Sequence, residues 1–320
     1  MEGYIKSVVL DTDEILQTYN DNPLDFFKDK KICLFKACLE YYYPGIRTCL
    51  KSMLEDFDLQ VSTSLEQSCC SGTFLQRNLI TRAQFAAINE RNIVSINEIA
   101  DILIVSCNGC YLSLLRGRKF LNSKDIREKT TKILKEFKKD ILFSPKLKIV
   151  HVIDFLHLIR EQIGERLKYS LNGLKCAVHY GCHYLNLLLD KKDIHSFIAP
   201  KNKLEDILTI LGGSIIEYQE RDSCCGWGAS QNVIHRDEAL QITFNKLKSA
   251  ESAGAELLVT NCPTCLYSLN KFRDDMKDLF GESPQIPAVH INELIGVLME
   301  YECDKYCIER ISPLIEELKI

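Results

Sequence analysis

Short apolar runs alternate along this chain with longer segments whose apolar residues recur at helical spacing. The short runs KICLFKA, LQVSTSLEQS and ILIVS, and later KCAVHYG, SIIEYQERDS and LLVTN, read as strands. The segments 73–92 and 233–253 predict helices, and Gly254 suits the position just beyond a helix end. Strands that alternate with helices predict parallel sheets joined by right-handed crossovers.

Each half of the chain adds a fourth strand to this pattern. KLKIVHVID and PAVHINE predict strands, followed by helices that end near Ile163 and Tyr301. The predicted fold class is therefore α/β. We expect two pseudo-symmetric lobes that face each other, each with a roughly four-stranded parallel sheet flanked by helices.

The two lobes are predicted to be copies of one unit. Residues 100–107, ADILIVSC, align with residues 255–262, AELLVTNC, at an offset of 155. Self-similarity of this kind is the signature of an internal duplication. The expected organisation is an N-terminal extension at 1–30, a first domain at 31–163, a linker at 164–174, a second domain at 175–302 and a closing helix at 303–320, begun at Ser312-Pro313.

Ten of the fifteen cysteines spell one pattern twice: a single cysteine, an adjacent pair and a C-x-x-C pair. In both copies 36 residues separate the adjacent pair from the C-x-x-C pair. Because the cysteines follow predicted strands, and ligands bind beyond the carboxyl ends of parallel strands, each set is expected to converge. The two sets are Cys38, Cys69, Cys70, Cys107 and Cys110, and then Cys182, Cys224, Cys225, Cys262 and Cys265.

Five thiols in a set favour an iron–sulfur cluster over zinc. A C-x-x-C pair alone fits zinc, a redox pair or half of a cluster site. Neighbouring side chains on an extended backbone point to opposite sides, so Cys69 and Cys70 are poorly arranged to bind one small ion together. Five thiolates also exceed the four of an ordinary zinc or cubane site. The sequence therefore indicates an enlarged or unusual cluster.

Composition indicates the class of protein and the compartment in which this metal chemistry is expected. With 320 residues, 46% hydrophobic and 26% charged, the chain is typical of a globular protein, and its formal charge of −4 argues against nucleic-acid binding. No signal peptide or membrane-length apolar stretch is visible, so we expect a cytoplasmic protein whose cysteines bind metal rather than form disulfides. A nucleotide-binding G-x-G-x-x-G after a strand and a ferredoxin-type cysteine run are both absent, which predicts an electron-supplying partner.

The doubled pattern resembles the cysteine-rich CCG domain. Two such domains in a chain of this size are similar to the B-subunit family of methanogen CoB–CoM heterodisulfide reductases. The resemblance covers about residues 31–302 and rests on the strings CLEYYYPG, HYGCH, DSCCGWG and NCPTC. It implies that the first five cysteines hold one noncubane 4Fe-4S cluster and the second five another. The chain departs from the motif where Ser71 precedes Gly72, so we expect a different local turn there.

The resemblance implies an oxidoreductase that reduces the CoM-S-S-CoB disulfide to two thiols in methanogenesis. It also implies a complex with two partners of the same family of enzymes, a ferredoxin-like iron–sulfur C subunit and a flavin-containing A subunit. Opening a disulfide takes two electrons. We hypothesise that two clusters facing one cleft each donate one electron and each capture one sulfur.

Several further residues have both a functional and a structural interpretation. His183 is a possible proton donor for a leaving thiolate, whereas His179 and His183 are equally suited to hydrogen bonds with cluster sulfur or backbone. His151 and His290 occupy equal places in the repeats and are interpreted as structural. Arg116, Arg118 and Lys119 are candidates for substrate sulfonate or phosphate, with a solvated face as the alternative. Trp227 is expected in core packing, with a cleft wall as the second option.

The other five cysteines are predicted to lie outside the clusters. Cys33, Cys49 and Cys176 are expected to pack as small buried apolar residues. Cys303 and Cys307 have helical spacing, but no second half of a metal site is visible. Three other functions stay open: thiol:fumarate reduction or lactate or glycolate oxidation by related CCG modules, a non-catalytic role in electron transfer within a complex, and a zinc-stabilised scaffold.

Overall fold

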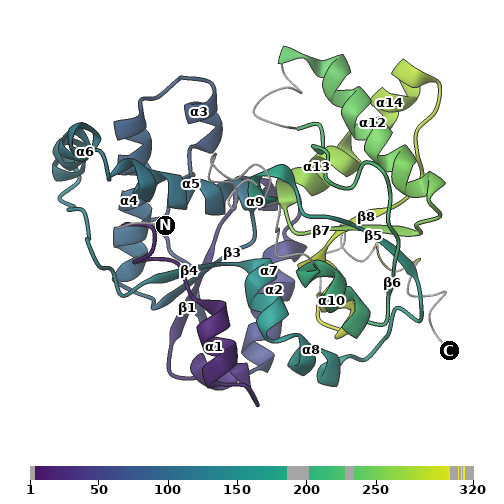
Figure 1. Cartoon of the computed structure of the whole chain (residues 1–320), viewed down its shortest axis with the longest axis horizontal. Helices are drawn as coiled ribbons and strands as arrows, with labels where there is room; N and C mark the ends of the chain where they lie inside the picture. The colour runs from purple at the N-terminus through teal and green to yellow at the C-terminus, as the bar shows by residue number, and fades with distance from the viewer. Residues whose placement is uncertain are drawn as a thin grey trace. The chain divides into compact units, whose positions relative to one another are not determined.

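Two four-stranded parallel sheets form the framework of the computed structural model (Figure 1). The structure describes residues 4–185, 202–227 and 234–302, together with Glu309, Ile311 and Pro313. The first sheet contains β1 (Lys31–Phe35), β2 (Gln60–Ser62), β3 (Ile102–Val105) and β4 (Lys148–His151), in the order β2-β1-β3-β4. The second contains β5 (Lys175–His179), β6 (Ser214–Ile215), β7 (Leu257–Thr260) and β8 (Ala288–His290), in the order β6-β5-β7-β8.

The two sheets have the same topology and the same register at their centres. Phe35 pairs with Val105 in the first sheet, and His179 pairs with Thr260 in the second. The central strands β3 and β7 are buried along their whole length. Continuous apolar sequence is expected of parallel strands that helices cover on both faces. The predicted α/β fold with two four-stranded parallel sheets is therefore confirmed.

Helices connect and cover the strands of both sheets. The first half of the chain contains α1 (Thr12–Thr18), η1 (Pro23–Phe26), η2 (Cys38–Tyr41), α2 (Gly45–Asp56), α3 (Gly72–Gln76), α4 (Arg82–Asn97), α5 (Asn108–Phe120), α6 (Lys124–Glu136), α7 (Val152–Leu158) and α8 (Arg160–Arg166). The second half contains α9 (Cys182–Leu185), α10 (Lys203–Ile210), α12 (Arg236–Ser252), α13 (Pro263–Lys271), α14 (Arg273–Phe280) and α15 (Ile291–Leu298). Within the described ranges, none of these helices combines the length and apolar character that crossing a membrane would require.

The chain divides into two compact units, and each is built in the same way. The first comprises Met1–Cys38 and Leu54–Leu158, and the second Leu39–Met53 and Ile159–Ile320. In the first unit α5 packs on β3 and β4, and α4 packs outside α5. In the second unit α13 packs on β7 and β8, and α12 packs outside α13. The predicted domain bounds follow the linear sequence and do not include the segment 39–53 in the second unit.

The N-terminal segment extends the first sheet. The Leu10 amide donates to the Ile149 carbonyl and the Ile149 amide donates to the Val8 carbonyl, which places this segment beside β4. Helix α1 follows, and the Asp11 side chain accepts a hydrogen bond from the Glu14 amide at its start. The N-terminal extension thus supplies a helix and an arm that is paired with the sheet.

The predicted helix over 73–92 is wrong, because the structure has two helices there. Helix α3 ends at Gln76, and Asn78 has a left-handed backbone with φ of 56°. Helix α4 begins at Arg82 behind a capping box, in which the Thr81 and Gln84 side chains each bond the other's backbone amide. The helix predicted to end near Ile163 is likewise divided at Ile159. The predicted helix over 233–253 corresponds to α12, and Gly254 follows it with φ of +83°.

Candidate metal centres

The five cysteines of the first set lie on segments that follow three strands of one sheet. Cys38 begins η2, three residues beyond β1, and the adjacent pair follows β2. Cys107 is the N-cap residue of α5, and Cys110 lies in the first turn of that helix. Cys70, Cys107 and Cys110 are buried, whereas Cys38 and Cys69 are exposed. The set therefore presents three buried thiols and two that reach the surface.

Contacts among these thiols connect all five members of the first set. A hydrogen bond with Cys69 raises the pKa of Cys38, and burial raises it further. Hydrogen bonds from Cys38 and Cys70 lower the pKa of Cys69. Hydrogen bonds with Cys107 and Cys70, together with burial, raise the pKa of Cys110 well above its ordinary value. Pairwise contacts thus bring the five side chains of the first set together, as the sequence predicts.

The second set repeats this arrangement at the end of the second sheet. Cys182 begins α9, three residues beyond β5, and Cys262 is the N-cap residue of α13. A hydrogen bond with Cys224 raises the pKa of Cys182. Hydrogen bonds with Cys225 and Cys262, together with burial, raise the pKa of Cys265 well above its ordinary value. A hydrogen bond between Cys224 and Cys225 joins these contacts into one continuous group of five thiols.

A side chain from the long outer helix holds each adjacent pair by its backbone. Asn89 of α4 donates a 3.1 Å hydrogen bond to the Cys70 carbonyl oxygen. In the second unit Thr243 of α12 and Ser268 of α13 donate hydrogen bonds of 2.9 and 2.6 Å to the Cys225 carbonyl oxygen. The sequence reasoning missed these residues, because only the fold brings them to the cysteine loop.

The residue after each adjacent pair has a left-handed backbone. Ser71 has φ of 54° and Gly226 has φ of +89°. A Cβ atom at Gly226 would lie 2.4 Å from the Ala239 carbonyl oxygen, so only glycine is accommodated there. The expectation that serine changes the turn in the first unit is therefore wrong in one respect: both turns have a left-handed residue at this position.

The donor set of each unit fits a thiophilic metal group. Several of the thiols are buried beside one another, and burial disfavours the thiolate form in the absence of a compensating cation. A bound metal supplies that positive charge and displaces the thiol protons. The cysteine patterns are consistent with iron–sulfur binding, while the donor set alone does not specify a cluster type.

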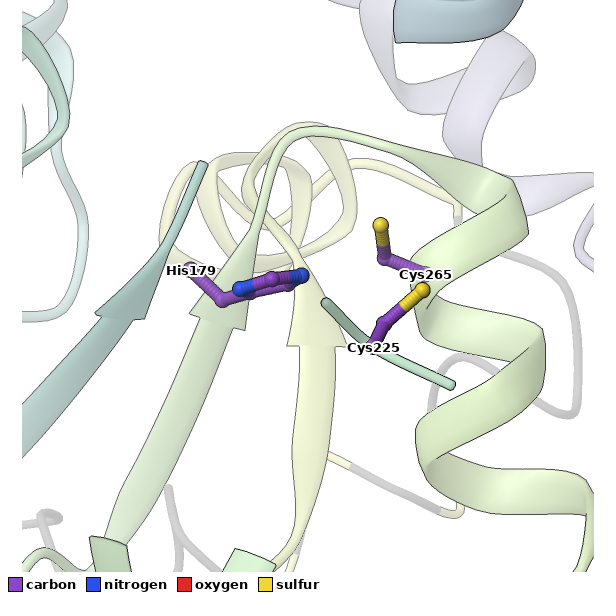
Figure 2. Close-up of side chains that lie close together, drawn as sticks. All are labelled: His179, Cys225 and Cys265. Carbon is purple, nitrogen blue, oxygen red and sulfur yellow. The ribbon is translucent and has the colours of Figure 1, made fainter. Parts of the chain in front are cut away.

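One histidine that lies against the second set distinguishes it from the first. The ligand atoms of His179, Cys225 and Cys265 lie within 4.8 Å of one another, and all three residues are buried (Figure 2). Burial lowers the pKa of His179 to about 3, and the nearby charge of Lys246 lowers it as well. Both effects favour the neutral imidazole in the metal-free protein. Its position three residues before Cys182 was the sequence signal for this contact.

The remaining histidines have more ordinary surroundings. His183 follows Cys182 in α9 and is half-buried. The buried rings of His151 and His290 each accept a 3.2 Å hydrogen bond at Nδ1, from the amides of Ile153 and Asn292. The contact at His290 caps helix α15. These bonds agree with the structural interpretation of His151 and His290.

Arg118 is not available to bind a substrate anion. Its side chain is buried and forms an ion pair of 2.7 Å with Glu90 of α4. It also donates to the backbone carbonyl oxygens of Tyr4 and Leu142 and to the Ser7 hydroxyl. Arg116 and Lys119 lie on the exposed side of α5, whereas Arg118 is buried. The three cations therefore do not form one anion-binding cluster.

Trp227 lies in a small aromatic group of the second unit. Its ring is half-buried and contacts Tyr267 at 4.8 Å and Phe272 at 6.1 Å between centroids. Tyr42 contacts the other side of this group through Tyr267, at 5.0 Å. Packing against neighbouring rings is thus the observed role of this tryptophan.

The cysteines predicted to lie outside the two sets behave as expected where they are described. Cys33, Cys49 and Cys176 are fully buried. Cys33 and Cys176 lie within β1 and β5, on the first strand of each unit. Cys303 and Cys307, like most of the predicted closing helix, lie outside the described residues.

Comparisons with known proteins agree with the duplicated pattern. The family model described as the cysteine-rich domain, CCG, matches residues 32–115 and 176–270, together more than half of the chain. The B subunit of the ferredoxin:CoB-CoM heterodisulfide reductase of Methanosarcina acetivorans is 28% identical over 89% of this chain and 93% of its own length. The 8-methylmenaquinol:fumarate reductase membrane anchor subunit of Wolinella succinogenes is 24% identical over 72% of this chain and 78% of its own.

A solved structure shares the fold. The crystal structure of a hypothetical protein from Helicobacter pylori aligns with a TM-score of 0.64 over 88% of this chain, at 14% identity. The chain spans about half the length of that protein. The similarity therefore bears on the architecture alone.

Proposed function

The chain belongs to the cysteine-rich CCG domain family, and on that premise we propose that it is the iron–sulfur catalytic subunit of a heterodisulfide reductase. The observation that carries this proposal is the gathering of two complete sets of five thiols, one in each unit. Similarity to the M. acetivorans protein over 89% of the chain supports it. The proposed substrate is the CoM-S-S-CoB disulfide.

The proposed ligands are the ten cysteines of the two sets, five for each cluster. Residues on the outer helices would keep each adjacent pair in place, since Asn89 and Thr243 bond the Cys70 and Cys225 carbonyl oxygens. The N-terminal ends of α5 and α13 would stabilise negative charge on the cysteines that begin them. When bound, two noncubane 4Fe-4S clusters would supply electrons one at a time.

The reaction breaks one sulfur–sulfur bond, takes up two electrons and two protons, and releases two thiols. A ferredoxin-like iron–sulfur C subunit, fed by a flavin-containing A subunit, is the proposed source of the electrons. His183 is the proposed proton donor, because it is half-buried and adjacent to Cys182. Histidine is the side chain that ordinarily titrates near neutral pH, which suits the delivery of a proton to a thiolate.

Anaerobic purification with quantification of iron and sulfide tests the metal assignment. We expect iron and sulfide in both units, and an electron paramagnetic resonance signal that changes when coenzyme M thiol is added. Cys70→Ala and Cys225→Ala should each remove one cluster and abolish turnover. Cys33→Ala, which alters a buried thiol within β1, should retain both clusters. A colourless protein that contains zinc would refute the proposal.

A second candidate is a non-catalytic role in electron transfer, within a reductase that has another substrate. Similarity to the W. succinogenes protein over 72% of the chain favours it. In the first candidate function the disulfide substrate reaches the clusters, whereas in the second only electrons do. Full iron content with a signal that is insensitive to both coenzyme thiols, and with no disulfide reduction by the complete complex, would favour the second candidate.

A further inference from the structure

The two units differ at one buried position beside their cysteine sets. Phe35 and His179 are the last residues of β1 and β5, and each lies three residues before the first cysteine of its set. Each pairs in register with a residue two positions before the C-x-x-C pair of its set, Val105 or Thr260. Both side chains are almost completely buried. A phenyl ring in one unit therefore corresponds to an imidazole ring in the other.

The imidazole ring is directed at the second cysteine set. Figure 2 shows His179 extending from the end of β5 toward Cys225 and Cys265, the latter on helix α13. The candidate ligand atoms of these three residues lie within 4.8 Å of one another. The ring nitrogens form no hydrogen bond with either cysteine sulfur, but they face the space in which a metal-bound sulfur would lie.

The imidazole also lacks a satisfactory partner within the described protein. Neither ring nitrogen has a well-formed hydrogen bond there, although the Arg221 backbone lies near enough to affect the pKa. His179 is 1% exposed, so water is largely excluded. A buried polar group without a partner costs free energy and indicates an unseen ion or group. Cys225 and Cys265 are the cysteines against which the ring lies.

A positive charge reinforces the difference between the units. Lys246 of α12 is fully buried, donates to the carbonyl oxygens of Glu220 and Arg221, and lies 5.4 Å from the Tyr218 ring. It follows Thr243 by three residues, as Asn92 follows Asn89 in the first unit.

In the first unit the residue at this spacing, Asn92, is a neutral amide. Its side chain accepts from the Ser68 amide and donates to the Ser68 carbonyl oxygen, just before the adjacent pair. Whether neutral or protonated, the imidazole of His179 has at least one ring N–H to donate. The second unit thus has a donor and a cation where the first has a phenyl ring and an amide.

We propose that, when the second centre is loaded, His179 donates a hydrogen bond to sulfur at this centre and thereby raises its reduction potential. Hydrogen bonds to cluster sulfur stabilise the more negative, reduced form. Phe35 offers the first centre no such donor. His179 is accordingly a positioning and tuning residue, and the inference rests on the proposed iron–sulfur function.

A redox titration followed by electron paramagnetic resonance tests this role without relying on turnover. His179→Phe gives the second unit the residue of the first and should shift the second signal to lower potential, with iron content retained. His179→Gln, which keeps an N–H donor, should recover part of the shift. Phe35→His should move the first signal upward. Cys176→Ala, a buried change on the same strand β5, should leave both potentials unchanged.

Labelling histidine with ¹⁵N separates a hydrogen bond from direct coordination. We expect a weak nitrogen coupling to the second centre that disappears in His179→Phe. Unchanged potentials and spectra in His179→Phe would overturn the inference while leaving the proposed function intact. A coupling as large as that of a nitrogen bound to iron would overturn it too. Iron-free protein would overturn both the inference and the proposed function.

Discussion

The side-chain amide of Asn89 donates a hydrogen bond of 3.1 Å to the backbone carbonyl oxygen of Cys70. Its second bond, to the Phe85 carbonyl oxygen, fixes the amide within α4. The outer helix is thereby tied to the adjacent cysteine pair. In the second unit the single hydroxyl hydrogen of Thr243 is shared between the carbonyl oxygens of Cys225 and Ala239, at 2.9 and 3.0 Å.

Asn89→Leu should destabilise the first centre selectively. The change removes the donor for a buried carbonyl group, and an unsatisfied group of this kind costs about 1–3 kcal/mol. We expect a matching loss in the free energy of unfolding and a reduced iron content in the first centre. Arg91→Ala on the same helix is the control, since that side chain is only half-buried. Unaltered stability and iron content in Asn89→Leu would contradict this view of the anchor.

Gly226→Ala should be far more disruptive than a second glycine change in the same unit. At Gly226 the new Cβ meets the Ala239 carbonyl oxygen and the Thr243 hydroxyl, in addition to the strain of φ +89°. Gly254 has a similar φ of +83° with open space around it. Gly254→Ala should cost about 1–2 kcal/mol from backbone strain alone, and Gly226→Ala clearly more, with loss of iron from the second centre. Equal costs in chemical denaturation would show that the close contact is unimportant.

Ser71→Gly should be tolerated in the first unit. Ser71 already has a left-handed backbone, with φ of 54°, so glycine relieves strain rather than adding it. We expect a free energy of unfolding within about 1 kcal/mol of the wild type and full iron content. A large loss of either quantity would indicate that the serine hydroxyl has a separate role.

Arg118→Met should destabilise the first unit without a specific effect on substrate affinity. Breaking a buried ion pair leaves the Glu90 carboxylate unpaired, which costs about 3–5 kcal/mol. Arg116→Ala and Lys119→Ala, on the exposed side of α5, should change the free energy of unfolding by about 0.5 kcal/mol or less. Thermal unfolding and KM for the disulfide distinguish the two roles. A raised KM in a stably folded Arg118→Met would restore the anion-binding interpretation.

Stability of the metal-free protein should depend on pH through Lys246. Burial lowers the pKa of Lys246 to about 8, below the ordinary lysine value of 10.5. Between these values the unfolded chain binds more protons than the folded one, so the unfavourable contribution of this lysine is relieved as pH rises from 8 toward 10.5. Relative to Lys246→Met, the wild type should gain stability over that interval. A difference that stays flat with pH would mean that Lys246 titrates normally.

His183→Gln should slow disulfide reduction while both centres keep their iron. Loss of a general acid typically costs about 10²-fold or more in rate. His235→Gln, at an exposed position of the same unit, is the matched control. An unchanged rate, measured with the complete complex, would exclude His183 as the proton donor.

Local pattern was sufficient to predict the sheets and the two cysteine sets. Strand ends such as Val105 precede the cysteines, and the repeat gives the cysteines the same order in both halves. The sheets and the cysteine sets could therefore be predicted without knowledge of distant contacts. The break before Arg82 was readable in principle, because Thr81 and Gln84 have the spacing of a capping box. Helical periodicity over 73–92 obscured it, since two short helices in succession have nearly the same pattern as one.

Arg118 shows why one feature was missed, and His179 shows why another was foreseen only in part. The partners of Arg118 include Tyr4 and Glu90, which are distant in sequence, so its burial follows from the fold rather than from its neighbours. For His179, the spacing to Cys182 was visible, but its approach to Cys225 and Cys265 depends on how a later loop and α13 return to β5. Non-local packing thus determines both the burial of Arg118 and the approach of His179 to the cysteines.

The chain passes between its two compact units more than once, because 39–53 belongs with the second although the flanking segments belong with the first. The Asn292 side chain holds this segment by a 2.9 Å hydrogen bond to the Ile46 carbonyl oxygen. If the chain were divided at the midpoint of the duplication, the C-terminal polypeptide would lack the segment 39–53. The N-terminal polypeptide would contain that segment without the unit to which it belongs. The second unit thus depends on a segment encoded within the first half of the chain.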